Sequence, residues 1–137
     1  MKIELTSNKT IGELQLEFNA AFPYLKLVFF KHAHDAYEGS PAKDILSDPD
    51  RRLLDVEKKP RVGVLYLEPD MPVWQVERLF KEEFGLFVQV FRKSGTIWLE
   101  TSVTDDLTLE QQNAKGLAGE PVRREPDELY TDYREQE

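Results

Sequence analysis

Along residues 2–31, the spacing of the hydrophobic positions changes twice, from the alternation of a strand to the spacing of a helix and back again. Ile3 and Leu5 alternate with polar residues, which predicts a half-buried strand. Beyond residue 10 the apolar positions recur at helical spacing and form one stripe: Ile11, Leu14, Phe18, Ala21 and Phe22. Pro23 ends this helix, and residues 24–31 are rich in β-branched and aromatic side chains, which is typical of a strand. The segment therefore predicts a βαβ unit over residues 2–31.

The same order of patterns returns in a later segment of the chain. Residues 61–67 predict a strand, an apolar stripe predicts a helix from Val73 to Phe84, and residues 86–92 predict another strand. Gly85 follows the helix, where a left-handed cap is expected. Several pairs of positions, all related by one constant offset, carry the same residue: Leu5 and Leu67, Phe18 and Phe80, Phe22 and Phe84, Val28 and Val90, Phe29 and Phe91, Lys31 and Lys93. We interpret residues 61–93 as a second copy of the unit.

Further elements are predicted after the second unit. Residues 93–95 read as a hairpin turn, and residues 96–101 as a fifth strand. A short helix follows and ends near Gly116. Capping boxes are predicted at two helix starts: Thr10 with Glu13, and Thr108 with Gln111.

Two βαβ units in tandem predict an α+β fold. The most economical packing is a ferredoxin-like βαββαβ sandwich, with two helices on one face of a four-stranded antiparallel sheet, an added C-terminal strand and short helices. We expect a single domain over residues 1–116. Residues 32–60 connect the two units and are expected to hold one or two short helices, because a structureless loop of that length is uncommon in a small domain.

Residues 117–137 differ from the rest of the chain. They hold seven acidic and three basic residues, and Pro121 and Pro126 interrupt them. This composition predicts a disordered tail. The alternative is a docking peptide, in which three apolar side chains form one face of a short helix after Pro126: Leu129, Tyr130 and Tyr133.

Composition restricts the classes of function. The 137-residue chain has a formal net charge of −8, which argues against nucleic-acid binding. It has no cysteine, so disulfides, thiol catalysis and thiolate metal sites are excluded. No apolar run approaches the roughly 18 residues that span a bilayer. No secretory apolar region follows the N-terminus, so we expect a cytoplasmic protein with no membrane partner.

One cluster has the residue types of a metal site. The two histidines of the chain, His32 and His34, are separated by one residue and followed by Asp35. This spacing can hold a divalent transition metal, although it supplies at most three ligands. The alternative is a polar strand end that enters a loop, with no cofactor.

Two other features have both a functional and a structural interpretation. Ser40 and Lys43 lie in a short loop that could bind an anion at a helix start, or Ser40 could simply cap that helix. Trp74 lies off the apolar stripe of its helix, and could mark a contact surface or cover the edge of the sheet.

The run VQVFRKSGTIWLETSVTDDLTLEQQN, at residues 88–113, resembles a family of small bacterial proteins. The resemblance extends over about the first 116 residues and includes the segments FPYLKLVFFKHAH and EGSPAKD. It implies a bacterial source and a recurrent module, and it implies no activity, substrate or cofactor.

The sequence as a whole favours a non-catalytic module that binds another protein, because no enzyme signature stands out. The internal repeat also allows a homo-oligomer built by edge pairing. The alternative is a protein that binds a metal or a small ligand, and is possibly an enzyme, at the cluster of His32, His34 and Asp35.

Overall fold

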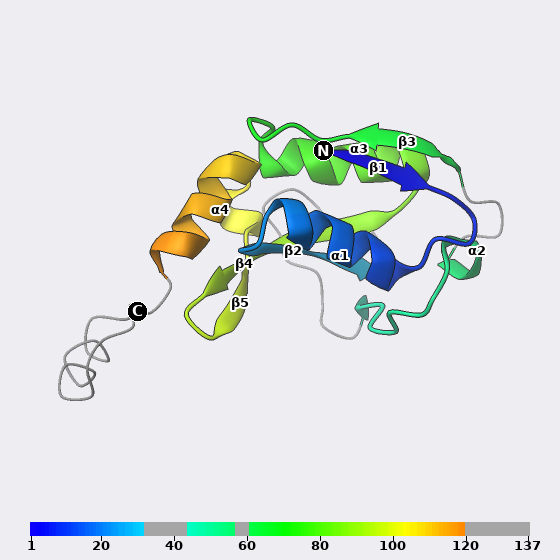
Figure 1. Cartoon of the computed structure of the whole chain (residues 1–137), viewed down its shortest axis with the longest axis horizontal. Coiled ribbons are helices and arrows are strands. Elements are labelled where there is room, and N and C mark those ends of the chain that lie inside the picture. The colour runs from blue at the N-terminus through cyan, green and yellow to red at the C-terminus, as the bar shows by residue number, and fades with distance from the viewer. Residues whose placement is uncertain (32–43, 57–60, 120–137) are drawn as a thin grey trace.

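The computed structural model describes residues 1–31, 44–56 and 61–119. These residues form a mixed α+β structure, which confirms the predicted class (Figure 1). The elements follow one another in this order: β1 (Lys2–Leu5), α1 (Ile11–Ala21), β2 (Leu25–Phe30), α2 (Leu53–Val56), β3 (Gly63–Tyr66), α3 (Val73–Phe84), β4 (Phe87–Ser94), β5 (Ile97–Glu100), the 3-10 turn η2 (Ser102–Thr104) and α4 (Leu109–Ala118).

The strands form two antiparallel sheets. One sheet pairs β1 with β3, and the other has the order β2-β4-β5. The ferredoxin-like arrangement is not confirmed, because the strands that were expected in one four-stranded sheet belong to two separate ladders within the described residues. Alternation along a strand predicts which side chains are buried, but it does not specify which strand lies alongside.

Near the centre of both ladders, residues of the first unit lie opposite equivalent or adjacent residues of the second unit. Ile3 lies opposite Leu65, which is its counterpart in the second unit. In the other sheet, Leu27 lies opposite Val90 and Val28 lies opposite Gln89. A two-fold rotation that exchanged the two βαβ units would leave both registers unchanged.

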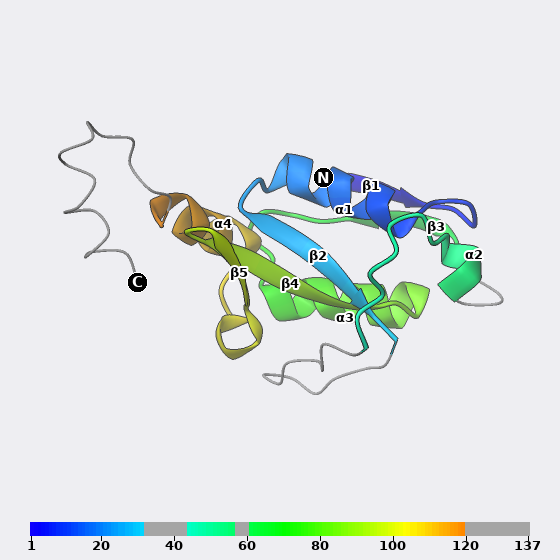
Figure 2. The same ribbon diagram turned by 90° about the horizontal axis from the view of Figure 1, so that it is seen from below.

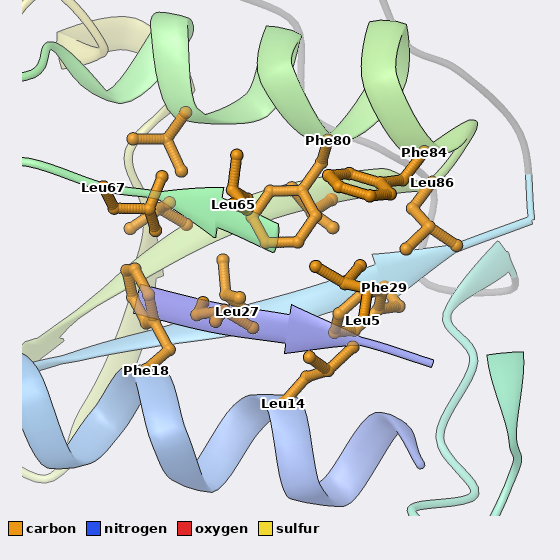
Figure 3. Close-up of a cluster of buried hydrophobic side chains, with 14 of the residues drawn as sticks. Leu5, Leu14, Phe18, Leu27, Phe29, Leu65, Leu67, Phe80, Phe84 and Leu86 are labelled. Atoms are coloured by element: carbon orange, nitrogen blue, oxygen red, sulfur yellow. The ribbon is translucent and has the colours of Figure 1, made fainter. Parts of the chain in front are cut away.

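The core lies between the two sheets and the two long helices. Figure 3 shows side chains of α1, such as Leu14 and Phe18, and side chains of α3, such as Phe80, converging between the strands. The rings of Phe29 and Phe80 meet edge to face, with centroids 6.3 Å apart and planes at 87°. Phe80 is fully buried, so its truncation to alanine would cost about 3–5 kcal/mol.

The predicted signals at helix ends and at the hairpin are confirmed. The Oγ1 atoms of Thr10 and Thr108 each accept a hydrogen bond from the backbone N–H three positions later, at 3.1 Å. Gly85 ends α3 with φ of 66°, and Gly95 turns the hairpin between β4 and β5 with φ of 61°. A left-handed backbone of this kind is accessible to glycine at little cost.

The first turns of α1 and α3 are capped in the same way, by backbone carbonyls of a distant segment. Four N–H groups take part: Ile11 donates to Arg51 O at 2.9 Å, Gly12 to Pro49 O at 2.9 Å, Val73 to Leu107 O at 2.9 Å, and Trp74 to Asp105 O at 3.0 Å. These bonds satisfy donors that have no partner inside a helix. Gly12 allows this approach, because a Cβ there would lie 2.9 Å from the Cβ of Pro49.

The short helices α2 and α4 continue from these two capping segments. Their first N–H groups bond the loop before the long helix of the same unit: Leu53 to Lys9 O at 2.9 Å, Leu54 to Ser7 O at 3.1 Å, Leu109 to Met71 O at 2.9 Å, and Glu110 to Pro69 O at 2.9 Å. The acceptors Lys9 and Met71 are equivalent positions of the two units. The helices α2 and α4 therefore start at equivalent places, although α2 has 4 residues and α4 has 10.

The helix α4 covers one end of the β2–β4 ladder. Asn113 accepts a hydrogen bond from the Tyr24 N–H at 2.9 Å, and Arg92 Nη1 donates to Gln112 Oε1 at 3.1 Å. Gly116 lies so close to Tyr24 that a Cβ at this position would come 2.5 Å from the Cβ of Tyr24. Figure 2 shows α4 beside one end of this ladder and α2 toward the other end.

Candidate functional site

A pocket of about 400 Å³ lies at the end of the β2–β4 ladder that is opposite to α4. It is formed where β2 ends, β4 begins and α3 gives way to β4. The described residues that line it come from five places in the chain: Phe30, Lys31, Val56, Arg61, Lys81, Gly85 and Phe87.

The apolar part of the lining comes from the strands and from α2. Phe30 and Phe87 lie opposite each other in the β2–β4 register, and Phe30 is buried. The left-handed Gly85 turns the chain directly from α3 into β4, which brings Phe87 to the pocket. Val56, the last residue of α2, adds an aliphatic side chain.

The polar part of the lining is cationic. Lys31, Arg61 and Lys81 carry a positive charge, and the described lining residues include no carboxylate. This sign is opposite to the net charge of −8 of the whole chain. Three neighbouring cations in a concave site attract anions, and they do so most strongly at low ionic strength.

Two of the cations lie at the last turn of α3, Arg61 through a hydrogen bond and Lys81 as a residue of the helix. Arg61 Nη1 donates to the Glu82 backbone oxygen at 2.7 Å, in the last turn of the helix. A guanidinium has five N–H donors, so this bond positions the group and leaves donors for a ligand or solvent. Lys81 lies in the same last turn, where a positive charge complements the helix dipole.

The carboxylate of Glu82 is itself paired on the surface of α3. Arg78 Nε donates to Glu82 Oε1 at 2.9 Å, and this hydrogen bond raises the pKa of Arg78. The acidic residue whose carbonyl holds Arg61 is thus neutralised by a neighbour on its own helix.

The pocket adjoins the position that corresponds to the contact of α4 with β4 in the other unit. Phe30 and Val56 line the pocket. The counterpart of Phe30 in the second unit is Arg92, and the counterpart of Val56 in α4 is Gln112. A hydrogen bond from Arg92 of β4 to Gln112 joins this strand to α4. Val56 is the last described residue of α2, so the structure describes this helix only as far as the counterpart of Gln112.

Most of the predicted site residues lie outside the described part of the chain. This holds for the metal cluster of His32, His34 and Asp35, for the loop residues Ser40 and Lys43, and for the apolar tail residues: Leu129, Tyr130 and Tyr133. Within residues 1–31, 44–56 and 61–119, no group of three or more His, Cys, Asp or Glu side chains is placed to hold a metal ion. These sites stay predictions.

Trp74 is the one predicted site residue that the structure describes. It lies in the first turn of α3 with 39% of its surface exposed, and its backbone N–H donates to Asp105 O. It lies at the capped start of α3, whereas the pocket lies at the other end of that helix. The structure does not bring Trp74 together with the pocket.

The pocket residues were not foreseen from the sequence. Lys31, Arg61 and Lys81 are far apart along the chain, and each looks like an ordinary surface charge. The available signal was weak: Phe30 and Phe87 are aromatic residues at the ends of predicted strands. Only the β2–β4 register and the turn at Gly85 bring these side chains together.

Within the described residues, no helix has the length and apolar character required to cross a membrane. Comparison of the chain with protein-family models, curated proteins and solved structures finds no match. The resemblance of residues 88–113 to a bacterial family gains no support from these comparisons.

Proposed function

We propose that the chain is a non-catalytic binding module whose pocket recognises acidic segments of a protein partner. The observation that carries the proposal is the combination of three cations with an apolar floor in one pocket. Lysine and arginine would pair with the carboxylates of the partner. Phe30, Phe87 and Val56 would bury one of its apolar side chains.

The size of the pocket supports recognition of a short segment. Ligand pockets have volumes of roughly 300–1,000 Å³, and 400 Å³ is at the lower end of that range. Such a site suits one anchoring side chain, while neighbouring carboxylates reach the lysines at the rim. An aromatic or aliphatic anchor surrounded by charges is a common arrangement at protein interfaces.

The chemistry of the lining also favours binding over catalysis. The described lining residues hold neither a hydroxyl or imidazole group nor a pair of carboxylates that could act as nucleophile or general base. The proposal retains the expectations that the partner is another protein and that the setting is a bacterial cytoplasm.

The experiment measures binding of fluorescently labelled acidic peptides to the full chain by anisotropy. The peptides carry Asp and Glu around a central Leu, Phe or Tyr, and neutral versions replace the acids by Asn and Gln. The pocket variant is Lys31→Glu with Lys81→Glu; Arg61 is left unchanged because it holds the end of α3. The control is Lys93→Glu with Lys115→Glu, which changes the net charge equally and leaves the pocket intact.

We expect the wild-type chain and the control to bind the acidic peptides alike. The pocket variant should bind at least about tenfold more weakly, because two attractive charges become repulsive. Equal affinity of the pocket variant and the control would overturn the proposal. So would the lack of any difference between acidic and neutral peptides.

A further inference from the structure

In each of the two units, a helix lies beside the same end of the strands: α2 in the first unit and α4 in the second. In the second unit, α4 extends over the strand ends and places Gln112, Asn113 and Gly116 against Arg92 and Tyr24. In the first unit, the equivalent helix α2 is described as far as Val56, the counterpart of Gln112, and Val56 lines the pocket. The pocket thus adjoins the counterpart of a surface on which this fold already seats a helix.

We infer that the occupant of the pocket is the C-terminal tail of this same chain, bound through residues 127–137 as an acidic helix. This inference rests on the proposed function, and it assigns to the pocket an acidic segment of the chain itself, with which a protein partner would compete. Residues 127–137 hold five acidic residues and one basic residue, so their charge is complementary to that of Lys31, Arg61 and Lys81.

The apolar residues of the tail have the spacing of one face of a helix. In a helix, Leu129 and Tyr133 lie four positions apart and Tyr130 and Tyr133 three apart, so the three share one face. That face would meet the apolar floor of Phe30, Phe87 and Val56. The acidic residues on either side would face the three cations.

The linker before the proposed helix is comparable in length to the strand that separates the α4 end of the ladder from the pocket. The β2 strand, which separates the α4 end of the ladder from the pocket, has 6 residues and so spans about 20 Å. Residues 120–126 connect the end of the described chain to the proposed helix, and seven extended residues span about 23 Å. The pocket of a second copy is equally accessible, so the test must separate the two cases.

The test uses a full-length chain whose own tail is disabled by Tyr130→Ala with Tyr133→Ala. A labelled synthetic peptide of residues 120–137 is titrated against this variant. We expect binding that weakens with salt and falls at least about tenfold when Lys31→Glu and Lys81→Glu are added. Adding Lys93→Glu and Lys115→Glu instead should leave it unchanged. The wild-type chain, whose tail competes, should bind the peptide several-fold more weakly than the tail variant.

A zero-length carbodiimide cross-link separates the two geometries. Links from Lys31 or Lys81 to tail carboxylates should form within monomers at low concentration if the tail binds its own molecule, and within dimers if it binds a second copy. If the tail peptide does not bind the tail variant while other acidic peptides do, the inference is wrong and the proposed function stands. If neither binds, both are wrong.

Discussion

Gln15 of α1 and Glu77 of α3 make matching hydrogen bonds to the strand that follows each helix. Gln15 Nε2 donates to Leu27 O at 2.9 Å, and Glu77 Oε2 accepts from the Val90 N–H at 3.1 Å. The two side chains occupy equivalent positions of the two units, and Leu27 and Val90 face each other in the β2–β4 ladder. One unit uses a donor and the other an acceptor for the same task, which is to hold a long helix to its strand.

Because Gln15 donates and Glu77 accepts, exchanging Gln for Glu at the first position and Glu for Gln at the second should change the free energy of unfolding by different amounts. Gln15→Glu places a carboxylate against a carbonyl oxygen, which cannot donate, so the free energy of unfolding should fall by about 1–3 kcal/mol. Glu77→Gln keeps an oxygen that can accept from Val90, so this hydrogen bond survives and the loss of stability through it should be smaller. Urea denaturation of both variants at neutral pH measures the difference. Equal losses would contradict the assigned hydrogen bonds.

The close contact between Gly116 and Tyr24 predicts that a methyl group is not tolerated there. Gly116→Ala should destabilise the chain by about 1–3 kcal/mol, because overpacking forces α4 away from the strand ends. Gly119→Ala is the matched control, since a Cβ there would come no closer than 3.6 Å to its neighbours. Thermal unfolding followed by circular dichroism compares the two, and a stabilised Gly116→Ala would contradict the packing.

The capping box at the start of α4 makes a separate prediction. Thr108→Ala removes the hydroxyl that accepts from the Gln111 N–H and should cost about 1 kcal/mol. Thr108→Ser retains the acceptor and should restore most of the loss. Chemical denaturation of the three proteins measures both effects. A serine variant no more stable than the alanine variant would show that the hydroxyl contributes little.

The contacts of Asp55 at the start of α2 predict that the stability of the fold depends on pH. Hydrogen bonds from the side chain and then the backbone N–H of Arg52 hold the pKa of Asp55 below its ordinary value. A carboxyl whose pKa is lowered by folding stabilises the fold above its ordinary pKa, and this contribution is lost as the pH falls through the lowered value. Arg52→Ala should therefore raise the pKa of Asp55.

The measurement is an NMR titration of the Asp55 carboxyl carbon. Arg51→Ala is the control, because Arg51 makes only the smallest of the contributions to this shift. An equal rise in both variants would mean that general surface charge, rather than the contact with Arg52, lowers the pKa of Asp55.

Periodicity predicted most of the elements because it reports directly on burial. The stripe from Val73 to Phe84 became α3, and the caps at Thr10 and Gly85 are where local chemistry placed them. The pairing of β2 with β4 could not be predicted, since either strand would bury the same side chains against another neighbour. The pocket could not be predicted either, because that pairing brings Lys31, which follows β2, to the end of α3 where Lys81 and Arg61 lie.

Sequence patterns also could not predict that α2 and α4 are equivalent. Leu53 and Leu109 match, but most of the residues around them differ in type, and they are not related by the offset that relates the two βαβ units. The relation is carried by backbone hydrogen bonds, such as those from Leu53 to Lys9 and from Leu109 to Met71, and these place few demands on side-chain identity.

Each sheet of this fold takes one strand from the first unit and one from the second, with β1 on β3 and β2 on β4. A chain that carried only one half would therefore lack both of these ladders, and the second half would keep only the β4–β5 hairpin. Such a chain could complete both ladders only by docking against a second copy, as a two-fold homodimer of half-length chains. For the same reason, two separately expressed halves should fail to fold alone and should fold together when they are mixed.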